Sequence, residues 1–141
     1  MNIDKIKIKE KISAFLLEKE EIKLAYIFGS FINKEKYNDI DVAVYLNHEF
    51  NRNDLIKYPY GYESNLNSEI NLLVREKIDF IVMNNSEITL QHRIINKGIL
   101  LFSRDKPKRI SYENYIRKLY IDSANIRKIK RKYLSRKIAN A

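Results

Sequence analysis

Two aspartates, Asp39 and Asp41, stand two residues apart at the start of an apolar run. Because successive side chains of a strand point to opposite faces, both carboxylates project to one side, and Ile40 and Val42 project to the other. Like charges on one face of a buried strand are costly unless a cation or several hydrogen-bond donors compensate them. The spacing therefore indicates a functional pair of carboxylates, and metal chemistry is the function that it suggests.

A third carboxylate and a Gly-Ser pair belong to the same pattern. Asp79 lies in a run that is otherwise apolar on both faces, so an unpaired structural role would be costly. Gly29 and Ser30 follow another apolar run, where the glycine allows a turn or the close approach of a second group. Asp39 alone could cap a loop and Asp41 alone could pair with a lysine. The ordered combination of all three motifs favours a functional site.

Helical and strand periodicities predict the elements that position these residues. Apolar residues at helical spacing predict an amphipathic helix over residues 4–20, with Asp4 as its N-cap. Apolar strands over 24–28 and 39–46 flank a polar loop, residues 31–38. Since the connection is short, we expect the two strands to be antiparallel neighbours.

The second half of the chain alternates between helical and strand patterns. The predicted order is an irregular segment 47–61, a helix over 63–77, a strand over 78–83, a helix over 87–97, a strand over 99–102 and a final helix that begins at Ser111. Ser86 is the predicted N-cap of the helix over 87–97, and Gly98 is its predicted C′ residue.

Charge is distributed unevenly along the 141 residues. Residues 1–103 carry 14 Lys and Arg against 15 Asp and Glu, whereas residues 104–141 carry 13 against three. We expect one domain, with residues 1–103 as its core and residues 104–141 as a basic helical extension packed on it. A basic end on a neutral body indicates an acidic partner surface or a polyanion. With no cysteine and no apolar run of about 18 residues, the chain is expected to be cytoplasmic and without a membrane partner.

The motif order resembles that of the nucleotidyltransferase superfamily of the DNA polymerase beta type. Gly29-Ser30 follows the first predicted strand, Asp39 and Asp41 open the second, and Asp79 lies in the third. The sequence is more closely similar to the minimal nucleotidyltransferase (MNT) antitoxins that pair with HEPN-domain toxins, through segments 66–83, 90–102 and 120–122. The resemblance implies an α/β (α+β) fold of the polymerase beta type, with a small mixed sheet flanked by helices and a long basic C-terminal helix.

The resemblance also implies roles for the motif residues. Asp39, Asp41 and Asp79 would be the catalytic carboxylates and would hold two Mg²⁺ ions, with Mn²⁺ as an alternative; oxygen ligands suit both metals. Gly29 and Ser30 would contact the triphosphate of ATP. An arginine that the family commonly places in the following loop is absent here, so Lys34 or Lys36 would supply the positive charge, without the planar fork of Arg.

The implied activity is transfer of AMP from ATP to a tyrosine hydroxyl of a cognate HEPN ribonuclease toxin, which neutralises the toxin in a hetero-oligomer. One alternative is a catalytically weak antitoxin that binds and occludes the toxin. Another is nucleotidyl transfer to a small molecule or to RNA. The basic C-terminal helix could dock the acidic side of the toxin, or contact RNA held by the toxin.

The sequence is compatible with more than one role for His92 and for a group of three tyrosines. His92 lies on an apolar helix with no second histidine within ligand spacing, which favours a structural role over a catalytic one. Tyr58, Tyr60 and Tyr62 could stack on an adenine or a partner, or could pack their own loop.

Overall fold

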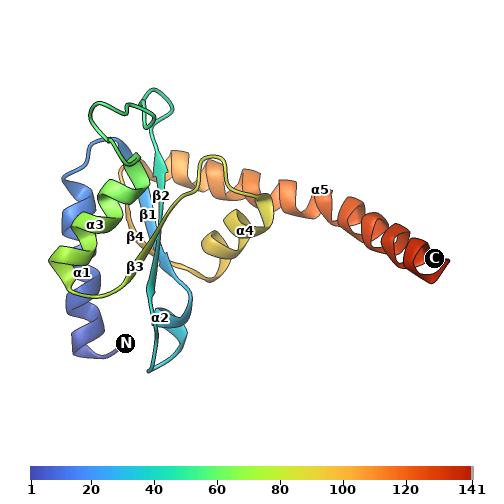
Figure 1. Cartoon of the computed structure of the whole chain (residues 1–141), viewed down its shortest axis with the longest axis horizontal. Coiled ribbons are helices and arrows are strands. Elements are labelled where there is room, and N and C mark those ends of the chain that lie inside the picture. Colours follow the sequence, from blue (N-terminus) through green and yellow to red (C-terminus); the bar gives the residue numbers. More distant parts are fainter. Residues whose placement is uncertain (141) are drawn as a thin grey trace.

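A four-stranded sheet forms the centre of the computed structural model, which describes residues 1–140 (Figure 1). Its strands are β1 (Ile22–Phe28), β2 (Ile40–Leu46), β3 (Ile78–Val82) and β4 (Ile99–Ser103). The strand order is β3-β2-β1-β4. β1 is antiparallel to both β2 and β4, and β2 is parallel to β3. The predicted mixed sheet and the antiparallel pairing of its first two strands are confirmed.

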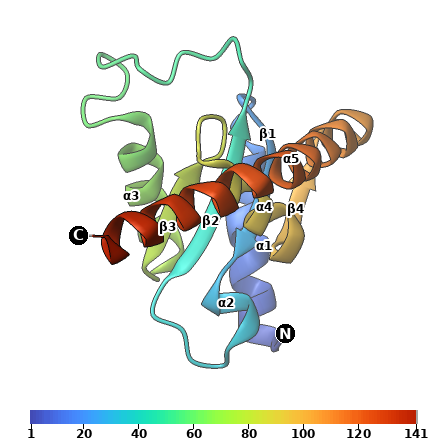
Figure 2. The same cartoon turned by 90° about the vertical axis from the view of Figure 1, so that its right-hand side faces the viewer.

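Helices cover both faces of the sheet. They are α1 (Ile3–Leu17), α2 (Ser30–Asn33), α3 (Tyr62–Val74), α4 (Ile88–Lys97) and α5 (Lys106–Ala139). Figure 1 shows α1 and α3 on one face, with α4 and the first part of α5 on the other. The short α2 follows β1 at the end of the sheet farthest from the loop between β2 and α3 (Figure 2).

Alternation along the strands divides the core into two layers. Ala25 and Ile27 of β1 pack with Ile12 and Leu16 of α1 and with the apolar side of α3. The opposite side chains of β1 join Ala43 of β2 in a second cluster beneath α4 and α5. Since Asp41 stands two residues before Ala43, its carboxylate belongs to the side of the sheet that faces α4 and α5.

A buried hydrogen bond attaches the first turns of α5 to the sheet. The Tyr26 hydroxyl on β1 donates to Glu113 Oε1 of α5 at 3.0 Å. Glu113 also pairs with Arg109 at 2.9 Å and with Arg117 at 3.3 Å, so its carboxylate is compensated by two guanidinium groups. Burial and the neighbouring Glu113 raise the pKa of Tyr26, which keeps the phenol protonated as a donor.

The rest of α5 extends beyond the sheet (Figure 1). Its 34 residues correspond to a length of about 51 Å at 1.5 Å per residue. Glu113 and Ile116 are its buried residues, and both lie in the first third of the helix. No helix within residues 1–140 has the combination of length and apolar character needed to cross a bilayer.

Three predicted helix boundaries were wrong. The N-cap of α1 is Asn2, whose side chain accepts from the Lys5 amide at 2.8 Å, and Asp4 lies in the first turn. The N-cap of α4 is Glu87, because the Ser86 hydroxyl instead donates to the Val82 carbonyl at 2.9 Å.

The final helix begins at Lys106, five residues before the predicted start. Asp105 is its N-cap and accepts from the Lys108 amide at 3.1 Å. Pro107 therefore lies in the first turn, where its missing N–H needs no partner, and does not separate the helix from the preceding strand.

Candidate active site

The Gly-Ser turn lies at the end of β1, where the chain enters α2. Gly29 has φ 82° and ψ −156°, a conformation that a residue with a Cβ adopts only with strain. A Cβ at this position would lie 2.2 Å from Oδ2 of Asp41. The close approach predicted for Gly29 is confirmed, and the approaching group is a carboxylate of the same chain.

Sheet pairing brings two of the predicted carboxylates side by side. Asp41 is the second residue of β2, and it pairs in register with Phe28 on one side and with Asp79 of β3 on the other. Asp39 directly precedes β2. Asp39 and Asp41 are half-buried, whereas Asp79 is exposed. The three carboxylates therefore converge on the edge of the site that Gly29 and Ser30 line.

The pKa of Asp41 reflects the proximity of the other two carboxylates. Partial burial, followed by the charges of Asp39 and Asp79, raises the pKa of Asp41 to about 6. Arg93 of α4 opposes the shift with its positive charge. The charges of Asp39 and Asp79 therefore make ionisation of Asp41 less favourable, which is the situation that a bound cation would relieve.

The donor set fits a hard divalent cation. Within residues 1–140, no three carboxylate or imidazole groups are arranged to hold a metal ion as they stand, so the structure shows neighbouring carboxylates and not a formed metal centre. All the converging ligands are oxygens, as Mg²⁺ prefers, and the missing side chain of Gly29 leaves space beside Asp41. The role of Asp39, Asp41 and Asp79 as metal ligands therefore stays a prediction.

The segment after α2 is fixed by a residue that sequence reasoning missed. Lys5 of α1 is only 7% exposed, and its Nζ donates to the carbonyls of Phe31, at 2.6 Å, and Lys34. The ammonium also lies 5.2 Å from the ring centroids of both Phe31 and Tyr37. The first residues of the predicted loop belong to α2, and Lys5 fixes the backbone there. The side chains of Lys34 and Lys36 remain exposed.

Arg93 is the second missed residue. It is exposed on α4, and among the cationic side chains its charge is the one that acts on Asp41. The charge of a guanidinium thus acts on the carboxylates although the loop arginine expected from the resemblance is absent. The only sequence signal was a basic residue on the polar side of a helix, which many surface helices share.

Comparison with known proteins places this chain in a family. The model of the family described as Polymerase beta, Nucleotidyltransferase matches residues 10–107, which include β1, α2, β2 and β3. The chain belongs to this nucleotidyltransferase family. A search of curated proteins finds no match.

Solved structures show the same fold as this nucleotidyltransferase. One is the tri-AMPylated Shewanella oneidensis HEPN toxin in complex with MNT antitoxin, with a TM-score of 0.70 and 18% identity over 92% of this chain and 98% of the matched chain. A toxin–antitoxin structure with AMP-PNP also has a TM-score of 0.70 and 18% identity, over 89% and 98%. The toxin–antitoxin MntA-HepT matches with a TM-score of 0.68 and 17% identity, over 92% and 98%. The fold expected from the resemblance is confirmed.

Two side-chain groups of this nucleotidyltransferase lie outside the carboxylate site. His92 stacks on Tyr120 of α5 with ring centroids 3.7 Å apart and planes 2° apart, and Arg127 covers Tyr120 at 4.3 Å from the ring centroid. His92 thus connects α4 to α5. Tyr58 and Tyr62 are buried and pack edge to face with centroids 5.1 Å apart, whereas Tyr60 is exposed.

Proposed function

We propose that this chain is an antitoxin nucleotidyltransferase that transfers AMP from ATP to a tyrosine hydroxyl of a HEPN ribonuclease toxin and so neutralises it. The observation that carries the proposal is the convergence of Asp39, Asp41 and Asp79 beside Gly29, in a chain of the polymerase beta nucleotidyltransferase family. Support also comes from structural neighbours that contain an AMPylated HEPN toxin or AMP-PNP.

The proposed reaction is an in-line substitution at the α-phosphorus of ATP. The tyrosine oxygen forms a bond to phosphorus, the bond from phosphorus to the bridging oxygen breaks, and pyrophosphate leaves with the electron pair. Asp79, the most exposed of the three carboxylates, would accept the proton of the tyrosine hydroxyl. Two Mg²⁺ ions bound by Asp39, Asp41 and Asp79 would supply charge neutralisation for the attacking hydroxyl and the leaving pyrophosphate.

The residues around the carboxylates would position the triphosphate. Gly29 leaves the backbone accessible at the turn, and the half-buried Ser30 hydroxyl would donate to a phosphate oxygen. We assign the main phosphate-binding cation to Arg93, because its positive charge acts on Asp41 and its guanidinium offers a bidentate fork. Lys34 and Lys36, which the sequence predicts for this role, would add long-range attraction from exposed positions.

The partner would dock on the outer part of α5. Ile126, Ile129 and Tyr133 follow each other at intervals of three and four residues, which places them on one side of the helix, and they are 56%, 66% and 64% exposed. They stand among the basic residues that dominate the end of the chain. A HEPN toxin with an acidic, partly apolar surface would complement this side of α5, and RNA held by the toxin would meet the same positive charge.

Mass spectrometry of the purified pair tests the proposal. Incubation with ATP and Mg²⁺ should increase the toxin mass by whole AMP units, and tandem fragmentation should locate the increment on a tyrosine. Asp39→Ala with Asp41→Ala should abolish the increment. An unmodified toxin with the wild-type chain, or an equal increment with the double variant, would refute AMP transfer by this site.

A second candidate is inhibition by occlusion alone. The exposed length of α5 and the absence of the loop arginine favour it, since a large docking surface can block a ribonuclease without chemistry. Growth rescue separates the two functions. If the Asp39→Ala, Asp41→Ala variant rescues cells that produce the toxin as well as the wild type does, occlusion is sufficient.

A further inference from the structure

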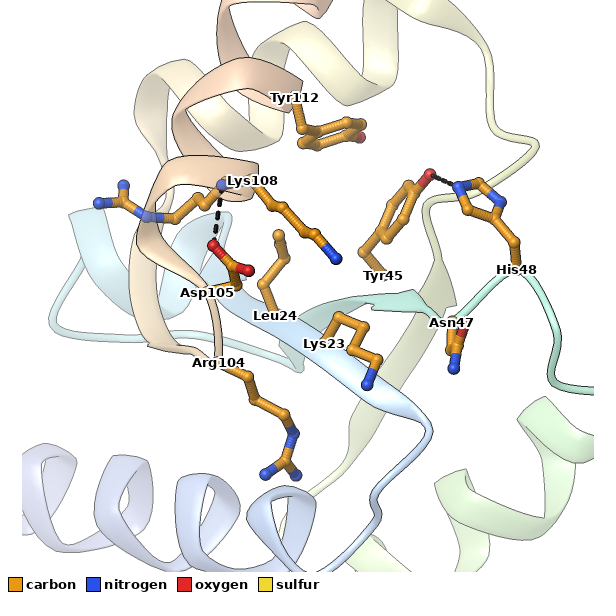
Figure 3. Close-up of a pocket in the computed structure, with 10 residues that line it drawn as sticks. Lys23, Leu24, Tyr45, Asn47, His48, Arg104, Asp105, Lys108 and Tyr112 are labelled. Carbon is orange, nitrogen blue, oxygen red and sulfur yellow. Dashed lines mark hydrogen bonds between the residues drawn. The ribbon is translucent and has the colours of Figure 1, made fainter.

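A cavity of about 450 Å³ lies at the opposite end of the sheet from the carboxylates. Figure 3 shows the residues that line it. It is lined by the start of β1, the end of β2 and the first turns of α5. In the β1–β2 register, Leu24 pairs with Tyr45 here, whereas Phe28 pairs with Asp41 at the candidate active site. Four residues of strand correspond to about 13 Å, so the cavity is separate from that site.

Positive charge dominates the lining. Four basic residues, Lys23, Arg104, Lys108 and Arg109, contribute to it against one carboxylate, that of Asp105. Lys23 and Lys108 are exposed, and neither forms a salt bridge in the part of the chain that the structure describes. Figure 3 shows the Lys108 side chain extending from α5 toward Tyr45, on the same side as Lys23. The two ammonium groups are therefore free to bind an anion.

Two other charged residues of the lining, Arg104 and Asp105, are fixed by hydrogen bonds to the backbone. Arg104 donates to three carbonyls, those of Leu17 at 2.7 Å, Lys19 at 3.0 Å and Ile22 at 2.6 Å. These acceptors are neutral, so its guanidinium is held in place while its positive charge stays uncompensated. Asp105 caps α5 through the Lys108 amide, and its carboxylate is already engaged there (Figure 3).

Aromatic rings form another part of the lining. The Tyr45 ring lies 4.8 Å from Tyr112 and 5.6 Å from His48, measured between centroids. The Tyr45 hydroxyl and His48 Nε2 are hydrogen-bonded at 3.0 Å, and the Tyr112 hydroxyl donates to Gln91. Their polar ends are engaged, so the rings stay in place and present an apolar surface together with Leu24.

We propose that this cavity is a second nucleotide-binding site. Lys23 and Lys108 would bind the phosphate of a mononucleotide through charge-assisted hydrogen bonds, and the base would pack against Tyr45 and Tyr112. Its volume is within the range of small-molecule sites, and its combination of cations with fixed rings matches the two chemical parts of a nucleotide. The site is independent of the proposed AMP transfer, because binding here needs none of the three carboxylates.

Nuclear magnetic resonance of the full chain, in metal-free buffer of constant ionic strength, tests the inference. Titration with AMP should shift the backbone amide resonances of Lys23, Tyr45, His48 and Lys108 in a saturable manner. Those of Gly29 and Ser30 report the candidate active site separately. Inorganic phosphate should bind the cavity several-fold more weakly than AMP, because it lacks the ring contact.

Charge-neutralising variants provide the decisive comparison. Lys23→Gln with Lys108→Gln should weaken AMP binding at the cavity at least about tenfold. Lys118→Gln with Lys128→Gln removes the same charge from exposed positions that do not line the cavity, and should bind AMP as the wild type does. The proposal fails if AMP causes no saturable shift at the cavity, or if both double variants bind equally. It also fails if inorganic phosphate binds as tightly as AMP, or if only a single-stranded RNA shifts these resonances.

Discussion

The Cβ that Gly29 lacks would lie 2.2 Å from Oδ2 of Asp41. Gly29 terminates β1 with a positive φ, and Asp41 pairs with Phe28, the residue just before the glycine. The position of the turn that ends β1 and the position of the Asp41 carboxylate near the start of β2 therefore depend on each other. A substitution at Gly29 must therefore displace the carboxylate.

Gly29→Ala should lower the rate of AMP transfer at least about a hundredfold, because a displaced Asp41 loses its alignment. Gly61→Ala is the matched control. Gly61 also has a positive φ, of 95°, but nothing lies within 4 Å of its missing Cβ. Both variants should lose about 1–3 kcal/mol of stability from backbone strain, and Gly29→Ala should lose more because its Cβ also meets Asp41. Equal transfer rates in the two variants would contradict a role for the Gly29–Asp41 contact.

Asp41→Asn should stabilise the metal-free protein at alkaline pH. The pKa of Asp41 is raised to about 6 in the folded state from its ordinary value of 3.8. The stability that protonated Asp41 contributes is therefore fully present below about pH 4 and is lost as the pH rises through about 6. The full shift corresponds to roughly 3 kcal/mol, and solvent screening at this half-buried group reduces it to about 1 kcal/mol.

Thermal unfolding in EDTA measures this effect. At pH 8 the Tm of Asp41→Asn should exceed that of the wild type by about 3 °C, and the difference should disappear at pH 4. Asp122→Asn, at an exposed position of α5, is the control and should leave Tm unchanged at both pH values. A lower Tm for Asp41→Asn at pH 8 would show that its charge is compensated within the protein.

Mg²⁺ should raise the Tm of the wild type in proportion to the logarithm of its concentration, because a ligand that binds only the folded state stabilises it. Removal with EDTA should reverse the shift. Asp41→Asn should show little or no response, since one of the proposed ligands is lost. If the variant and the wild type respond equally to Mg²⁺, the ions bind elsewhere on the chain.

Arg93→Gln should raise the KM for ATP about tenfold by removing the charge-assisted bonds to phosphate. Arg93→Lys should recover only part of the loss, because Lys lacks the planar fork. Steady-state kinetics of toxin AMPylation would measure both. Lys34→Gln with Lys36→Gln is the competing variant. A larger loss of ATP affinity there than in Arg93→Gln would place the phosphate-binding cation in the loop, as predicted from the sequence.

Ile129→Glu with Tyr133→Glu should weaken toxin binding at least about tenfold, by placing charge in the proposed interface. Both residues are exposed, so the fold should be unaffected. Ile56→Glu offers a control, because Ile56 is 95% exposed but lies on the loop before α3. Binding measured by calorimetry should be unchanged in the control. Unimpaired binding of the α5 variant would place the partner elsewhere.

The sheet and its carboxylates could be predicted because their signals are local. Apolar runs identify the strands, and the two-residue spacing of Asp39 and Asp41 fixes their common side. The start of α5 was missed since Pro107 suggests a break, although proline is well tolerated in a first helical turn.

Contacts between distant residues could not be predicted in this way. Lys5 resembles any exposed lysine of a basic helix, and only the folded chain brings its ammonium to carbonyls 26 and 29 residues away. The charge of Arg93 likewise acts on Asp41 only because α4 packs on the side of the sheet to which that carboxylate belongs. Such pairings depend on tertiary packing and leave no periodic trace in the sequence.

The bond between Tyr26 and Glu113 has a geometric consequence for the choice of target. It attaches the first turns of α5 to β1, the strand that leads into the Gly-Ser turn. A partner bound to the outer part of the helix would consequently be held at a fixed distance from the carboxylates. The length of α5 would then determine which hydroxyl of the partner reaches the three carboxylates. A change in that length would redirect the modification to another hydroxyl.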